Sequence, residues 1–171
     1  MNVLRLIDRW MVKLEEHILS YSIILIAIMV VGNVLSRAIT GSSWAFSQEV
    51  SRFAVTVATF MGISYAARKG RHISMSAFYD LAPFPIRKAL AIIIPAITAV
   101  VLFVMSVFAF DYFMSLVDSG RVTTAMQVPV YLFAMFVPIG FVLGGIQFLR
   151  NMWVNIKEKE VYLAQEKKDY S

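Results

Sequence analysis

Four residues able to form hydrogen bonds or ion pairs stand within or beside long apolar stretches of the sequence: Asn33, Glu49, Arg52 and Asp111. A polar or charged side chain in hydrocarbon is costly, so each of them needs a partner or a function. Steps of three and four residues lead from Glu49 through Arg52 to Thr56, which places the three on one face of a helix. Such a polar stripe is predicted to face protein rather than lipid.

Three kinds of chemistry fit this set. The first is an internal clamp in which Arg52 is neutralised by Glu49 or Asp111, and the second is an interface with a partner protein. The third is a path for an ion or proton, since carboxylates inside a membrane often serve that role. The third is disfavoured because Asp111 is expected toward the outer third of its helix and no paired helix breaks mark a substrate site. The sequence leaves the first two open.

Enzyme chemistry has little support. The two histidines, His17 and His72, stand at the edges of apolar stretches, whereas bis-histidine haem ligation needs them facing each other among the helices. Cysteine is absent, which excludes disulfides, thiolate zinc sites and a thiol nucleophile. No serine has a base and an acid at a spacing typical of a nucleophile. We therefore expect no enzymatic activity and no cofactor, and a haem-binding anchor of a redox enzyme is kept as the alternative.

The elements that must position these residues are four apolar stretches, at residues 18–36, 50–67, 89–117 and 129–150. A hydrocarbon core of roughly 30 Å is crossed by about 20 helical residues, and each stretch meets or nearly meets that length. Apolar residues make up 59% of the chain and charged residues 16%, so little sequence remains for a water-soluble catalytic domain. We predict an all-α integral membrane protein whose residues 1–156 form a single domain of four transmembrane helices.

Both ends of the chain differ from the apolar stretches. Residues 1–17 place apolar side chains on one helical face and charged ones largely on others, which predicts an amphipathic helix in the inner interface with Trp10 at headgroup depth. The alternative is a cytosolic extension of the first span. Residues 157–171 are rich in lysine and glutamate and are predicted to form a charged cytoplasmic tail.

Lysine and arginine are concentrated in the N-terminal segment, the second connection and the C-terminal segment. By contrast, the first connection has Arg37 at its edge and the third has Arg121. This bias predicts cytoplasmic termini, with the first and third connections on the opposite side of the membrane. Because the cations flank apolar helices, the net charge of +5 indicates lipid headgroups rather than nucleic acid as the partner. A basic cluster at the inner end of the second stretch is predicted to contact headgroups or the cytoplasmic surface of a partner: Arg68, Lys69, Arg71 and His72.

Small residues and prolines predict how the helices pack and bend. Gly140 and Gly144 have the small-xxx-small spacing that lets another helix approach closely. Pro95 predicts a kink or a boundary in the third stretch, and Pro138 predicts a kink in the fourth. The third stretch would be about 43 Å long as a helix, well beyond the hydrocarbon core, so a strong tilt is expected.

Several short motifs resemble the small membrane subunit of tripartite ATP-independent periplasmic (TRAP) transporters, the DctQ-like family. Their order and spacing carry the resemblance, and they cover nearly the whole chain: Trp44, Glu49, Arg52 and Gly62; Arg68-x-Gly70-Arg71-His72-Ile73; Pro129-x-Tyr131; and Pro138-Ile139-Gly140.

The resemblance implies a multi-pass protein of the bacterial inner membrane that does not itself translocate substrate. In that family a large membrane subunit holds the substrate and sodium sites and moves like an elevator, and a periplasmic protein captures the substrate. The small subunit packs against the stationary part of the large one and helps dock the binding protein. It also implies structural or interface roles for Trp44, Glu49 and Arg52, and organic acids as substrates, of the sialic-acid or C4-dicarboxylate class. The alternatives are the redox anchor and a small stand-alone channel or exporter.

Overall fold

The computed structural model describes residues 2–69, 83–157, 162–164 and 167–168. Four helices in this part are long and apolar enough to cross a membrane, which confirms the predicted fold class. They are α1 (Asn2–Thr40), α2 (Ser47–Lys69), α4 (Phe84–Ser119) and α6 (Phe136–Lys157). A one-turn helix, α5 (Tyr131–Ala134), precedes α6, and two short strands near the C-terminus, β1 (Tyr162–Ala164) and β2 (Lys167–Lys168), pair antiparallel.

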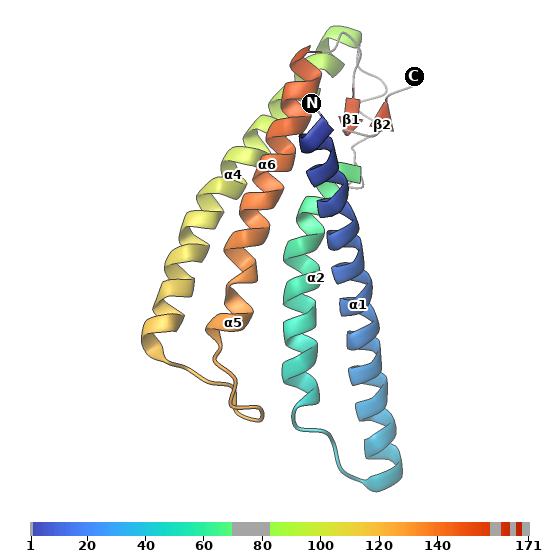
Figure 1. The fold of residues 1–171 in the computed structure, drawn as a ribbon, viewed down its shortest axis with the longest axis vertical. Helices are drawn as coiled ribbons and strands as arrows, with labels where there is room; N and C mark the ends of the chain where they lie inside the picture. Colours follow the sequence, from blue (N-terminus) through green and yellow to red (C-terminus); the bar gives the residue numbers. More distant parts are fainter. Residues whose placement is uncertain (1, 70–82, 158–161, 165–166, 169–171) are drawn as a thin grey trace.

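The four long helices lie in a row rather than in a closed bundle (Figure 1). Helix α1 packs on α2, α2 packs on α6, and α6 packs on α4. Few residues of the two flanking helices are buried. In the most apolar 18-residue segment of each helix, 6% is buried in α1 and 11% in α4, against 28% in both α2 and α6. The chain alone therefore leaves the two broad faces of the row uncovered.

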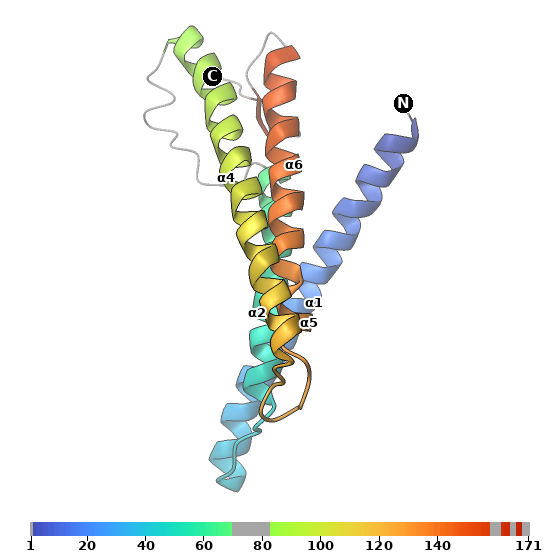
Figure 2. The same cartoon turned by 90° about the vertical axis from the view of Figure 1, so that its left-hand side faces the viewer.

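The first helix is continuous, which fits the alternative of an extension of the first span; the interfacial location of residues 1–17 stays a prediction. Helix α1 runs for 39 residues without interruption. The reason is local: neither glycine nor proline occurs before Gly32, so nothing in the sequence ends the helix near residue 17. The beginning of α1 diverges from α4 and α6 (Figure 2), and Trp10 is exposed there.

The third apolar stretch forms one helix, so the boundary considered at Pro95 is wrong. Pro83 precedes the helix and Pro85 stands in its first turn, where a missing N–H group costs nothing. The helix then continues through Pro95 and ends at Gly120, whose left-handed backbone (φ 58°) and N–H bond to the Val117 carbonyl close its last turn.

In the fourth stretch a one-residue interruption at Met135 separates α5 from α6, and Tyr131–Lys157 together form one membrane-spanning stretch, so the kink at Pro138 stays a prediction. Helix α5 ends at Ala134 and α6 begins at Phe136. Pro138 explains the division, because it has no N–H group to donate to the carbonyl of Ala134, four residues earlier. In α6 itself Pro138 stands in the first turn, where it is tolerated.

The orientation in the membrane follows from the charge bias alone and stays a prediction. Because the chain has no cysteine, single thiols introduced at Ser42 and Lys157, both exposed, would report it. We expect a membrane-impermeant maleimide to label position 42 from the periplasmic side of intact cells and position 157 only after the membrane is opened. Labelling of both thiols from one side would contradict the topology.

Candidate partner-binding surface

The first connection is folded back onto the outer end of α1. The Asn33 side-chain oxygen accepts a hydrogen bond from the backbone N–H of Trp44 at 2.7 Å. The indole of Trp44 lies against Gly32, where an added Cβ would be 2.9 Å from the ring, and the ring stacks on Phe46 with centroids 5.8 Å apart. The structure thus brings Asn33 and Trp44 together and gives the side-chain oxygen of Asn33 a donor within the chain.

Ser47 begins α2, and its side chain bonds to the neighbouring helix rather than capping its own. Its hydroxyl is buried and donates to the carbonyl of Met29 at 2.8 Å. Because Met29 lies in α1, this bond ties the start of α2 to the neighbouring helix.

Residues 121–130 form a small hairpin between α4 and α5. Two backbone bonds close it, from the Thr123 N–H to the Val128 carbonyl at 2.8 Å and from the Val130 N–H to the Arg121 carbonyl at 2.9 Å. Gln127 adopts a positive φ of 55° in the turn. We call this segment the outer hairpin.

Glu49 holds the tip of the outer hairpin. Its carboxylate accepts bonds from the backbone N–H groups of Ala125 at 2.7 Å and Met126 at 2.9 Å, and from the Thr124 hydroxyl at 3.1 Å. Hydrogen bonds to an ionised acceptor are roughly twice as strong as neutral ones. Glu49 therefore joins the first turn of α2 to a segment more than 70 residues away in the sequence.

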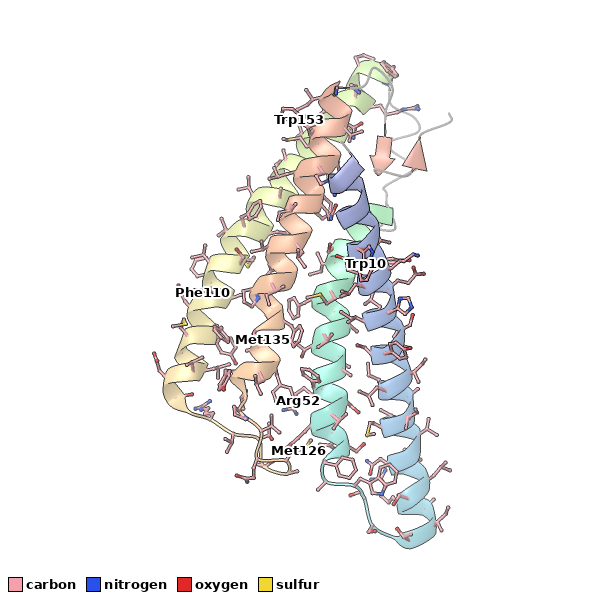
Figure 3. The ribbon with its side chains drawn as sticks, in the orientation of Figure 1. Trp10, Arg52, Phe110, Met126, Met135 and Trp153 are labelled. Atoms are coloured by element: carbon pink, nitrogen blue, oxygen red, sulfur yellow. The ribbon has the colours of Figure 1, made fainter. Side chains whose placement is uncertain are left out.

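Arg52 and Asp111 are both exposed, and no hydrogen bond or ion pair joins either side chain to another group in the described part of the chain. Arg52 projects from α2 on the side of α5 (Figure 3). The predicted internal clamp is therefore wrong. Asn33 binds Trp44 and Glu49 binds the outer hairpin, and neither of them bonds to Arg52 or Asp111. The carboxylate of Glu49 accepts hydrogen bonds from backbone N–H groups, and this explains why it does not pair with Arg52 one turn away.

The small residues of α6 mediate close helix contacts. A Cβ added at Gly140 would lie 2.5 Å from the carbonyl oxygen of Phe60, and one at Gly144 would lie 2.6 Å from a methyl carbon of Ile63, both on α2. The adjacent Gly145 would meet the ring of Phe103 on α4 at 3.0 Å. The Gly140–Gly144 spacing indicated this approach, whereas nothing singled out Gly145.

A buried polar cluster at the inner end of the row was missed by the sequence reasoning. Glu15 on α1 is 3% exposed and accepts a bond from the hydroxyl of Ser64 on α2 at 2.7 Å. Arg68 lies one turn beyond Ser64 on the same helix and is 1% exposed. The prediction that Arg68 contacts lipid headgroups is therefore wrong, because its side chain is buried within the protein.

Three amide side chains of α6 extend this cluster: Gln147, Asn151 and Asn155 are all buried. The Asn151 amide donates to the carbonyl of Ala67 on α2 at 3.0 Å, and the Asn155 amide donates to the carbonyl of Asn151 at 3.0 Å. Their spacing of four residues continues the face of Gly140 and Gly144, and this was the signal that could have identified them.

Of the remaining residues of the basic cluster and the two histidines, the structure describes Lys69 and His17. Lys69 is the last residue of α2, while Arg71 and His72 lie outside the described residues. His17 is exposed on α1, and its Nδ1 atom lies 2.6 Å from the carbonyl of Lys13. That bond keeps this ring nitrogen on its own helix.

Comparison with known proteins identifies a family. The family model described as "Tripartite ATP-independent periplasmic transporters, DctQ component" matches residues 26–158, which include α2, α4 and α6 in full. The chain is also 40% identical over 163 residues to the ectoine TRAP transporter small permease protein TeaB of Halomonas elongata. That alignment covers 95% of this chain and 84% of the relative.

The close contact at Gly140 predicts that one added methyl group will lower the stability of the protein. We expect Gly140→Ala to lower the free energy of unfolding by about 1–3 kcal/mol, because the added Cβ would overlap the backbone of Phe60. Gly62→Ala is the matched control, since its Cβ would meet Leu19 at an ordinary 3.5 Å. Thermal unfolding of both variants in detergent measures the difference, and equal stability of the two would contradict the assigned contact.

The hydrogen bonds of Glu49 predict protection of the outer hairpin. In Glu49→Gln we expect the amide hydrogens of Ala125 and Met126 to exchange about tenfold faster, because the ionised acceptor is lost. Gln48→Ala, an exposed neighbour in the same turn, should leave this exchange unchanged. Hydrogen exchange of the peptide over residues 121–130 provides the measurement. If Glu49→Gln and the native chain exchange at the same rate, the carboxylate does not hold the hairpin.

Proposed function

Because the chain belongs to the DctQ family of tripartite ATP-independent periplasmic transporters, we propose that it is the stationary companion of a large membrane subunit that performs translocation. It is a small transporter subunit and a multi-pass protein of the inner membrane, not an enzyme. The redox-anchor alternative is therefore dropped. The observation that carries the proposal is the 40% identity to a TRAP small permease over 95% of this chain.

The arrangement of the helices supports a scaffold role. A row of four helices has two broad faces and little interior, and many large apolar side chains of α1 and α4 lie on its surface. Helix association in lipid depends on close packing and interhelical hydrogen bonds, and both join neighbouring helices here. Such a unit can enlarge the stationary part of a carrier without enclosing a path for solute.

The outer end of the row supports a second role, which is to help dock the periplasmic substrate-binding protein. Exposed side chains are found there on the first connection, Trp44 and Phe46, and at the tip of the outer hairpin, where Met126 lies on the same side of α2 as Arg52 (Figure 3). Aromatic residues, methionine and arginine are enriched in protein interfaces. Because Glu49 fixes the hairpin, this surface would be presented to a partner without ordering a loop.

The name of the relative points to a different substrate from the organic acids expected from the sequence. Its name assigns ectoine rather than a sialic acid or a C4-dicarboxylate. We therefore propose ectoine as the first substrate to test for the transporter that contains this chain. We place substrate and sodium binding in the large subunit, so no residue here is assigned to either.

Reconstitution tests the proposal. We expect this chain, expressed with its large membrane partner, to be recovered as a complex, and liposomes that hold the complex to take up ectoine when the binding protein and a sodium gradient are added. Liposomes with this chain alone, or with the large subunit alone, are the controls and should show no uptake above background. Uptake by this chain alone would show instead that it is a self-contained carrier.

A further inference from the structure

The contacts of α6 fix how deep Asp111 lies relative to the other helices. Gly145 of α6 meets Phe103 of the antiparallel helix α4, and Gly140 of α6 meets Phe60 of the parallel helix α2. Asp111 follows Phe103 by eight residues, or about 12 Å.

Counting back eight residues from Gly145 leads to Val137, at the start of α6. Since Val137 precedes Gly140 by three residues, it is level with about Val57 on α2. Asp111 is then also level with Val57, near the middle of α2 (Ser47–Lys69) and roughly 7 Å deeper than Arg52. Asp111 thus lies in the outer third of α4 (Phe84–Ser119), as expected from the sequence, and is level with the middle of α2.

The side chain of Asp111 stands on the face of α4 that points away from the protein. The buried residues of α4 define the face toward α6, and they include Ala99, Ser106 and Ala109. Asp111 follows Ser106 by five residues, which turns it about 140° away from that face. It is exposed, and no group in the described part of the chain bonds to it.

A carboxyl group at this depth cannot be left against acyl chains. Lysine and arginine can reach the headgroups from within the membrane, but the aspartate side chain has a single methylene and cannot extend over several ångströms. A neutral carboxyl would still need a hydrogen-bond partner in an apolar setting. Something outside this chain must therefore supply a donor.

The residues on the same face form an apolar seam that continues inward from Asp111. At steps of four and three residues it comprises Ile97, Val100, Val104 and Val107, all exposed. This is the spacing with which one helix packs along another, and a polar residue in such a seam sets the register of the pair. The surface therefore fits a helix rather than a loop.

A second copy of this chain is a poor occupant of the seam. Two copies inserted in the same direction and related by a two-fold axis would bring equivalent positions together, so Asp111 would face Asp111. Like charges at close range oppose ionisation and pairing. A different protein, with a cation at that depth, satisfies both the charge and the apolar seam.

We infer that the outward face of α4 docks a transmembrane helix of the large subunit, and that this helix carries an arginine or lysine that binds Asp111. The inference rests on the proposed function and names the surface through which it is exercised.

Photo-crosslinking and substitution in the co-expressed complex test it. A photo-reactive residue at Val104 should crosslink to the large subunit. Asp111→Asn should weaken the complex at least about tenfold, because the partner's cation loses its counter-charge within the membrane. Asp118→Asn, two turns nearer the outer end on the same face, is the matched control and should assemble normally. The isolated Asp111→Asn chain should unfold at the same temperature as the native chain, since no hydrogen bond or ion pair joins Asp111 to another of the described residues.

The outcomes separate this inference from the proposed function. Crosslinks from Val104 to a second copy or to lipid alone, or normal assembly of Asp111→Asn, would overturn the docking surface while the recovered complex still supports the companion role. Failure of the native chain to bind the large subunit would overturn both.

Discussion

The close approach of α6 to its two neighbours is the constraint on which the rest of the structure depends. In lipid no hydrophobic force drives one apolar helix onto another, so association relies on surfaces that fit. Gly140 and Gly144 let α2 come near, and Gly145 does the same for α4. Since α1 packs on α2 and α4 packs on α6, the α2–α6 contact holds the two halves of the chain together.

Polar bonds close the α2–α6 contact at both ends. At the outer end Glu49 of α2 binds the hairpin that leads into α5 and α6. At the inner end Asn151 of α6 binds the last turn of α2, and Ser64 joins α2 to Glu15 of α1. Hydrogen bonds between membrane helices are individually modest, at about 0.6–2 kcal/mol, but here they act at separate levels of one packed contact. The row is thereby fixed against both sliding and splaying, as a stationary element requires.

The sequence predicted the number and placement of the spans well, because length and apolarity alone decide them. It failed where contacts between distant residues decide the outcome. The partner of Glu49 is a backbone turn more than 70 residues away, so a nearby cation such as Arg52 looked the better candidate. Arg68 was assigned to headgroups because a basic residue at a helix end normally lies there, and only the folded structure shows that it is buried. Two features could be inferred from glycine and proline positions. Helix α1 is continuous because neither residue occurs before Gly32, and the interruption at Met135 follows from Pro138.

The flat arrangement fits the proposal that translocation takes place in the large subunit. A polar solute crossing a bilayer needs a path lined by protein on all sides, and a closed bundle or paired broken helices can provide one. A row in which each long helix packs mainly on the next one offers no such enclosure within the described part of the chain. The buried carboxylate of Glu15 joins α1 to α2 through Ser64, whereas Arg52 and Asp111 are exposed and are available to complementary groups on the proposed partner. The same geometry fits the proposed role of this chain as the companion of a carrier.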